Sequence, residues 1–180
     1  MDEFWVFGYG SLMWNPGFPY EERLPARAFG YRRSLCIWSH VHRGTPEKPG
    51  LVLGLDRGGS CHGVAFRVGR GDQADVLDYL RERELVTNVY KERLLPAALE
   101  DGRQVKAIGY VVDRTHEQYA GALAAREAAE IIRRSSGQSG PNDAYLFNTL
   151  AHLRQMGIRD HRLEDVEAMV TLAREAGTTV

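Results

Sequence analysis

A glutamate at position 84 falls on the apolar side of a predicted helix, where a charged side chain is unexpected. The segment GDQADVLDYLREREL, with a cap at Asp72, predicts a helix that ends near Leu85. Glu84 lies one i+4 step beyond Leu80 and two beyond Val76, so it falls on the apolar stripe. Burial raises the pKa of a carboxyl group, which can then accept and return a proton near neutral pH. Glu84 is therefore a candidate general acid and base.

Glu84 also has a structural interpretation. It stands at the end of the predicted helix, where it could form an ion pair with Arg83 or Arg81. Glu82 lies on the opposite side of the same helix, which is expected to face solvent. Periodicity alone leaves both interpretations of Glu84 open.

The stretch FWVFGYGSLMW places two glycines and a serine directly after a predicted buried strand. Gly8 and Gly10 allow backbone conformations and close approaches that side chains prevent, and Ser11 adds a hydroxyl group. A loop of this kind can bind an anionic group with its backbone N–H groups. The alternative is a tight turn that ends the strand among buried aromatic residues.

The elements that would position these residues are mainly strands, followed by helices. Strands are predicted over residues 4–7, 28–38, 50–56, 63–68, 89–95 and 104–113, with turns at RGTPEKPG and DRGGS. After the helix over 72–85, further helices are predicted over residues 120–135, 142–156 and 160–176. Strands that run together before the helices indicate the α+β class. The length of 180 residues predicts a single domain over 1–180.

Composition favours a small-molecule partner. The net charge is −1, so the chain has no overall positive charge with which to bind nucleic acid. No apolar run approaches the roughly 20 residues of a membrane span. Asp2 and Glu3 precede the first apolar run, whereas a secretory signal carries positive charge there. We therefore expect a cytoplasmic protein without a membrane or nucleic-acid partner; the sequence makes no prediction of its oligomeric state.

Metal and cysteine chemistry are disfavoured. His40 and His42 form a His-x-His pair on one face of a strand, and His62 lies elsewhere, but no third ligand stands in a recognised relation to them. Cys36 and Cys61 are too far apart for a redox pair and too few for a zinc ribbon, so both are expected to be packed thiols. No metal or organic cofactor is predicted.

Four stretches together resemble the ChaC-type γ-glutamylcyclotransferase family. They are VFGYGSLMW, SHVHRGTPEKPGLV, RERELVTNVY and GQSGPNDAYLFN, which follow the order of the family and span most of the chain. The resemblance implies a small mixed β-barrel of the γ-glutamylcyclotransferase-like type with flanking helices. Asn88 and the segment YKER, residues 90–93, depart from the family pattern of glycine and Tyr-Arg-Pro. These departures leave the acceptor preference open.

The resemblance further implies a lyase that cleaves glutathione into 5-oxoproline and Cys-Gly. The α-amine of the substrate attacks its own γ-amide carbonyl, so the reaction needs no protein nucleophile, metal or cofactor. Two alternatives are cyclotransfer on other γ-glutamyl amines or γ-glutamyl amino acids, and a non-catalytic module that only binds γ-glutamyl compounds.

The resemblance assigns roles to individual residues. Glu84 would take the proton from the substrate ammonium group and deliver it to the leaving amine. Arg43 would receive the glycine carboxylate, unless it is a solvated loop arginine. Tyr145 would bind the substrate or orient Glu84, unless it only packs in the core. The residues expected to bind substrate are Tyr9, Gly10, Ser11, Leu12, Arg43 and Tyr145.

Overall fold

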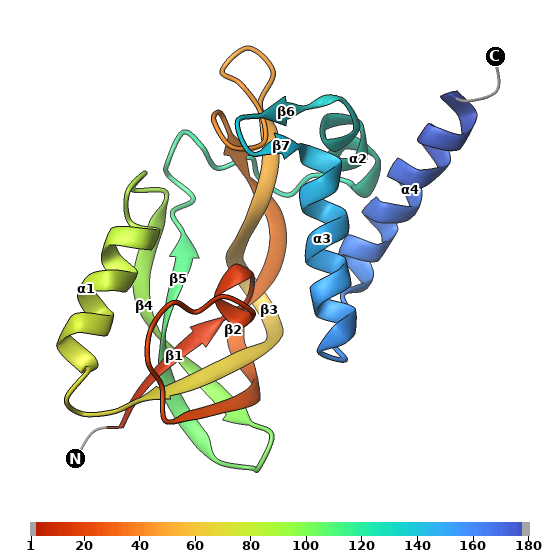
Figure 1. Ribbon diagram of the computed structural model, residues 1–180. Helices are drawn as coiled ribbons and strands as arrows, with labels where there is room; N and C mark the ends of the chain where they lie inside the picture. Colours follow the sequence, from red (N-terminus) through yellow and green to blue (C-terminus); the bar gives the residue numbers. More distant parts are fainter. Residues whose placement is uncertain (1–2, 178–180) are drawn as a thin grey trace. The chain divides into compact units, whose positions relative to one another are not determined.

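The structure is a computed structural model that describes residues 3–177 (Figure 1). The strands are β1 (Phe4–Gly8), β2 (Glu22–Ser39), β3 (Gly50–Val68), β4 (Tyr90–Leu99), β5 (Gln104–Val112), β6 (Ser136–Gly137) and β7 (Gly140–Pro141). The helices are the short 3₁₀ helix η1 (Ser11–Met13), α1 (Gln73–Glu84), α2 (Ala125–Arg134), α3 (Asn142–Gln155) and α4 (His161–Gly177). Most strands precede most helices, and the predicted α+β class is confirmed.

The described chain divides into two compact units. The first contains the residues up to Arg33 together with Leu55–His116, and the second contains Ser34–Gly54 and the residues from Glu117 onward. The long strands β2 and β3 each contribute residues to both units. A single domain over 1–180 stays a prediction, and its residues 1–2 and 178–180 lie outside the described part.

The first unit is built on a closed barrel of five strands in the order β1-β3-β2-β4-β5. Strand β1 pairs antiparallel with β3 and parallel with β5, whereas β4 pairs antiparallel with both β2 and β5. The sheet is therefore mixed, and the small mixed barrel that the family resemblance implied is confirmed.

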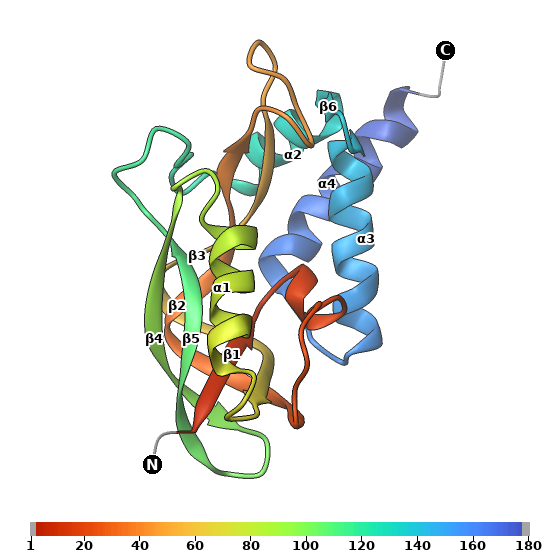
Figure 2. The same cartoon turned by 60° about the vertical axis from the view of Figure 1, so that its left-hand side comes forward.

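Alternating residues of the strands fill the interior of the barrel. Leu95 of β4 lies opposite Ala107 of β5, and both belong to one buried cluster with Leu99 and Val111. Successive residues of a strand face opposite sides, so the residues between these face outward. Helix α1 runs along the outer side of β4 and β5 (Figures 1 and 2). The guanidinium group of Arg81 on α1 fixes this position through two hydrogen bonds to Glu92 of β4.

Several predicted boundaries were wrong, including the end of the strand over 89–95, because β4 continues to Leu99. The segment DRGGS does not separate two strands, because β3 continues through it. Gly58 and Gly59 have φ angles of 106° and 69°, which only glycine adopts readily, and a bulge of this kind bends a strand without ending it. Strand β2 begins at Glu22 rather than at residue 28, and α2 begins at Ala125 rather than at residue 120.

The second unit contains a small helical bundle. Helix α2 packs against α3 and α4, which also pack against each other. A short hairpin of β6 and β7 leads directly into α3. Ile132, Leu146, Leu150, Leu153 and Val170 are at most 1% exposed and form its apolar interior. Over residues 3–177, no helix is both long and apolar enough to cross a bilayer.

Candidate active site

The predicted site residues fall into two groups, one in each unit. Residues 9–12 and Glu84 belong to the first unit. Arg43 and Tyr145 belong to the second unit. Each group has its own supporting contacts.

The two glycines of the N-terminal loop serve different purposes. Strand β1 ends at Gly8, and the backbone then turns back through η1, where the Met13 amide donates a hydrogen bond to the Gly10 carbonyl at 2.9 Å. A Cβ atom at Gly8 would lie 3.1 Å from the Leu12 Cβ and 3.3 Å from the Met13 nitrogen, so the returning chain itself requires glycine there. A Cβ atom at Gly10 would meet nothing within 4 Å. Gly10 is therefore not required by packing within the protein.

The side chains of this loop point in different directions. Leu12 is 5% exposed, so its side chain belongs to the core and its backbone is the part that a ligand could contact. Tyr9 is half-buried and packs against the interior cluster of the barrel. Ser11 is exposed. The loop therefore offers a ligand the Ser11 hydroxyl and backbone atoms, with the Tyr9 ring fixed beside them.

A buried arginine that the sequence interpretation overlooked holds the loop in place. Arg33 is 5% exposed, and its guanidinium group donates hydrogen bonds of 2.8 Å to the carbonyl oxygens of Tyr9 and His62. Charged donors form stronger hydrogen bonds than neutral ones, particularly where water is excluded. The only local sign in the sequence is that Arg33 stands shortly before the apolar run LCIW.

A second arginine connects the loop to Glu84. The Arg83 Nη2 atom donates a 3.0 Å hydrogen bond to Ser11 Oγ, while its Nε atom lies 3.7 Å from Glu84 Oε1. Its Nη1 atom donates to the carbonyl oxygens of Asn15 and Pro16 at 2.8 and 3.1 Å. One guanidinium group thus contacts both the serine of the loop and the glutamate of α1. The sequence interpretation had treated Arg83 only as an ion-pair partner of Glu84.

Glu84 is the last residue of α1, and its side chain is only 18% exposed. Burial raises the pKa of its carboxyl group, and the charge of Arg83 offsets this only in part. Arg81, the other possible partner, donates instead to Glu92 at 3.1 and 3.0 Å. Glu82 is exposed, as expected. These contacts suit a proton-transfer group, and the catalytic role of Glu84 stays a prediction.

Glu92, the carboxylate that pairs with Arg81, has the opposite electrostatic environment. Hydrogen bonds from Arg81 lower the pKa of Glu92, which also accepts a 2.9 Å hydrogen bond from the Tyr110 hydroxyl. Burial and this hydrogen bond to Glu92 raise the pKa of Tyr110. Environments that move two carboxyl pKa values apart assign them different roles. The environment of Glu92 favours its charged form, whereas the burial of Glu84 favours the protonated form.

The second group places Arg43 next to Tyr145. The Arg43 guanidinium carbon lies 5.5 Å from the centre of the Tyr145 ring, and Nη1 donates a 3.1 Å hydrogen bond to the Pro141 carbonyl. The Tyr145 hydroxyl accepts a 3.0 Å hydrogen bond from the Leu53 amide. A phenol that accepts a hydrogen bond retains a proton that it can donate. Tyr145 is thus oriented by hydrogen bonding as well as by packing.

Asn142, at the start of α3, is a second residue whose importance the sequence interpretation missed. It is fully buried, its Nδ2 atom donates to the Leu51 carbonyl at 2.9 Å, and its Oδ1 atom accepts from the Leu51 amide at 2.8 Å. The amide side chain thus pairs with Leu51 as a neighbouring strand would. This contact fixes the first turn of α3, which carries Tyr145.

Of the residues considered for metal or thiol chemistry, His40 has a buried Nδ1 atom with no hydrogen-bond partner among residues 3–177. Among residues 3–177, no group of three or more His, Cys, Asp or Glu side chains is arranged to hold a metal ion. The His42 Nδ1 atom lies 3.0 Å from Ser139 Oγ. Cys36 and Cys61 are buried free thiols, as predicted.

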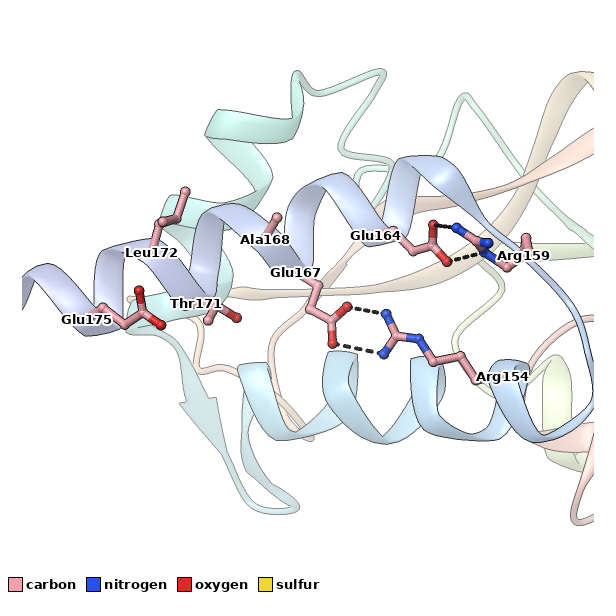
Figure 3. A pocket seen from close by; sticks show the side chains of 8 residues that line it. All are labelled: Arg154, Arg159, Glu164, Glu167, Ala168, Thr171, Leu172 and Glu175. Carbon is pink, nitrogen blue, oxygen red and sulfur yellow. Dashed lines mark hydrogen bonds and ion pairs between the residues drawn. The ribbon is translucent and has the colours of Figure 1, made fainter.

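An open pocket of about 700 Å³ lies between α3 and α4 of the second unit (Figure 3). Its two arginines are already neutralised, because Arg154 pairs with Glu167 and Arg159 pairs with Glu164. Each pair uses both oxygens of its carboxylate, and a ligand would have to displace these bonds. This pocket is therefore a poor candidate for the functional site.

Comparison with known proteins gives a consistent result. Residues 4–173 match the family described as ChaC-like protein. The chain is 36% identical to a glutathione-specific γ-glutamylcyclotransferase of Escherichia coli, over 90% of this chain and 70% of that protein. It is 34% identical to γ-glutamylcyclotransferase 2-3 of Arabidopsis thaliana, over 92% of this chain and 87% of that protein. The crystal structure of a yeast γ-glutamyl cyclotransferase specific to glutathione has a TM-score of 0.83 and 25% identity, covering 96% of this chain and all of that one.

Proposed function

The chain belongs to the ChaC-like family, and we propose that it is a γ-glutamylcyclotransferase that cleaves glutathione into 5-oxoproline and Cys-Gly. Its similarity to glutathione-specific relatives over nearly its whole length supports this activity. The observation that carries the mechanism is the raised pKa of the Glu84 carboxyl group. This group contacts Arg83, which also donates a hydrogen bond to Ser11 in the glycine loop, residues 8–12.

The reaction is an intramolecular displacement. Glu84 accepts a proton from the α-ammonium group, and the freed amine attacks the γ-carbonyl carbon to form the five-membered ring. The C–N bond to cysteine then breaks, and Glu84 returns its proton to the departing amine. The second proton of the new ring nitrogen passes to the same amine, which leaves as an ammonium group, so that one carboxyl group can serve both the removal and the delivery of a proton. The chain itself contributes mainly substrate folding, proton transfer and charge stabilisation.

The glycine loop would bind the α-carboxylate of the substrate. The open space beside Gly10 supports a close approach to the backbone, and Ser11 can add a hydrogen bond. Tyr145 would donate a hydrogen bond to the substrate. Arg43 would attract the glycine carboxylate of glutathione. The contact of the Arg43 guanidinium group with the Tyr145 ring orients this group.

The other details of the proposal rest on the sequence. A cytoplasmic location, and the absence of nucleic-acid or membrane partners, stay predictions. Acceptor preference is open as well, because residues 88 and 90–93 depart from the family pattern.

The activity is tested by measuring 5-oxoproline release from glutathione, other γ-glutamyl amines and γ-glutamyl amino acids. We expect release from glutathione at the highest kcat/KM of the panel. Release from another compound alone would assign the chain to the alternative substrate class. If none is cleaved but glutathione binds, the chain is a binding module.

The role of Glu84 is tested with Glu84→Gln, which keeps the size of the side chain but cannot accept the proton. We expect turnover to fall by about 10²- to 10⁴-fold, while the matched variant Glu82→Gln on the exposed side of α1 retains its activity. The binding of glutathione should change much less than kcat.

Stability provides the second measurement for Glu84→Gln. Because burial raises the pKa of Glu84, its ionisation lowers the free energy of unfolding as pH rises from its usual pKa through the raised value. The neutral amide removes this cost, so the variant should melt no lower than the wild type at pH 7. If Glu84 served mainly as an ion-pair partner, the variant would leave Arg83 unmatched and would melt lower.

A further inference from the structure

The interior of the barrel changes from apolar to cationic at one end. On β4, alternate residues face inward, and Leu95 belongs to the interior cluster. Two and four residues before Leu95 on the same face are Arg93 and Lys91. On β3, Arg57 stands two residues after the buried Leu55 of the same cluster. The inward-facing positions at this end of the barrel are therefore occupied by cations, and Arg57, Lys91 and Arg93 are exposed there.

These side chains line a pocket of about 250 Å³ in the first unit. Its cationic lining residues are Arg57, Lys91, Arg93 and Arg114. Its hydroxyl groups come from Tyr31 and Thr115, and its single carboxylate comes from Asp113. Helix α1 covers the outer side of β4 and β5, where Arg81 contacts Glu92 (Figure 2). The pocket and α1, which carries Glu84, thus lie on opposite faces of the same strands.

Two of the four cations are already balanced by carboxylates. Lys91 lies 3.3 Å from Asp113, and Arg114 lies 2.7 Å from the fully buried Asp56. The guanidinium groups of the other two, Arg57 and Arg93, pair with no carboxylate among residues 3–177, although the Arg57 backbone amide donates a 2.9 Å hydrogen bond to Asp56 Oδ1. The Arg93 guanidinium group donates only to the Glu92 backbone carbonyl, at 2.8 Å. The pocket therefore carries an excess of positive charge.

Like charges gathered at one end of a barrel repel one another, and a bound anion would relieve this repulsion. Guanidinium groups present fixed pairs of N–H donors that match the oxygens of phosphate. The pocket is smaller than the roughly 300 Å³ at which drug-sized ligand sites begin. Charge, donor geometry and size together specify a compact dianion.

We propose that this end of the barrel binds a small phosphate-bearing ligand through Arg57 and Arg93. The site is separate from the cyclotransferase site and independent of that activity. Tyr31 and Thr115 supply hydroxyl groups that can complete the coordination of the phosphate oxygens.

The test is calorimetric titration of the full chain with inorganic phosphate and pyrophosphate, at constant ionic strength. We expect saturable binding to the wild type and a rise in melting temperature that follows its occupancy. Arg93→Gln and Arg57→Gln should each weaken binding about tenfold or more, because each removes a charged hydrogen-bond donor. Arg70→Gln, an exposed arginine of the same unit outside the pocket, is the matched control and should bind as the wild type does.

Several results would overturn the assignment. The assignment is wrong if neither phosphate nor pyrophosphate binds saturably to the wild type. It is also wrong if Arg93→Gln, Arg57→Gln and Arg70→Gln all bind the anions with equal affinity. Binding of citrate but not of phosphate or pyrophosphate would replace the phosphate class with a polycarboxylate. Thermal melting of each variant shows whether it is folded, and either pocket variant suffices if the other unfolds. Glutathione turnover should be unchanged in both variants, so failure of this site is distinguishable from failure of the proposed function.

Discussion

Replacing Arg83 by methionine would test whether this arginine influences the pKa of Glu84 as well as holding the N-terminal loop. Methionine retains an unbranched apolar stem but removes the charge and every hydrogen-bond donor. The guanidinium group donates to Ser11 Oγ at 3.0 Å and to the Asn15 and Pro16 carbonyl oxygens, so these acceptors lose their partner. The bonds are partly exposed and not additive, and we expect a loss of about 2–4 kcal/mol in the free energy of unfolding.

The electrostatic consequence concerns Glu84 directly. At about 4 Å, two unit charges attract by about 1 kcal/mol in water and about 4 kcal/mol near a protein surface. The Arg83–Glu84 distance is 3.7 Å, with side chains 22% and 18% exposed, so the interaction lies between these limits. Arg83 lowers the pKa of Glu84 against the larger effect of burial. Without Arg83, the pKa of Glu84 must rise further.

The assay is the pH profile of kcat/KM for glutathione. Glu84 must be ionised to accept the ammonium proton, so the rate falls on the acid side of its pKa. In Arg83→Met this acid limb should move to higher pH. Arg81→Met is the control, because Arg81 pairs with Glu92 and should leave the limb in place. An acid limb that stays at the wild-type position in folded Arg83→Met would refute the coupling of Arg83 to the proton-transfer group.

Three further predictions concern the supporting residues and the absence of a metal. Gly8→Ala should lower the free energy of unfolding by about 1–3 kcal/mol, because the added Cβ atom meets the returning chain. Gly10→Ala should melt as the wild type does but raise KM for glutathione. Equal melting temperatures of the two variants would contradict this prediction. Asn142→Ala should lower the free energy of unfolding by about 2–4 kcal/mol, because the amide and carbonyl of Leu51 lose their hydrogen-bond partner. The control Asn148→Ala, at an exposed position of the same helix, should change this free energy little. Turnover should survive EDTA, and recovery of lost turnover on adding zinc would point instead to metal chemistry.

The parts of the fold that follow local rules could be predicted from the sequence. The helix that carries Glu84 was predicted to end near residue 85, and α1 ends at Glu84. Its apolar stripe was the useful signal, because Val76 and Leu80 are buried, whereas the side chain of the expected cap, Asp72, makes no capping hydrogen bond. The prediction of a turn at DRGGS was wrong, because glycines that permit a turn also permit a bulge within a strand. Which of the two forms depends on whether neighbouring strands keep pairing beyond the glycines, and that is a long-range property.

The candidate site was predictable only in part for the same reason. A single charged residue on an apolar stripe drew attention to Glu84, because the conflict is visible within one helix. The bond from Arg83 to Ser11 spans 72 positions, and the bonds from Asn142 to Leu51 span 91, so no local pattern reveals them. Arg33 left no distinct local signal, because it is one of several arginines in β2. Its acceptors, the Tyr9 and His62 carbonyls, are backbone atoms that a sequence does not display.

Charged residues at core positions mark structure or function according to how their charge is balanced. Asp56 is fully buried, yet Arg114 at 2.7 Å and Arg32 at 3.7 Å neutralise it, so it needs no ligand to explain it. Glu84 has one arginine at 3.7 Å, and burial still dominates its pKa, which leaves it able to exchange a proton. Arg93 faces the barrel interior with no carboxylate partner among residues 3–177. A charge that no opposite charge of the chain neutralises can be balanced by a proton or by a ligand. This distinction separates the roles we propose for the largely buried Glu84 and the exposed Arg93 from the structural role of Asp56.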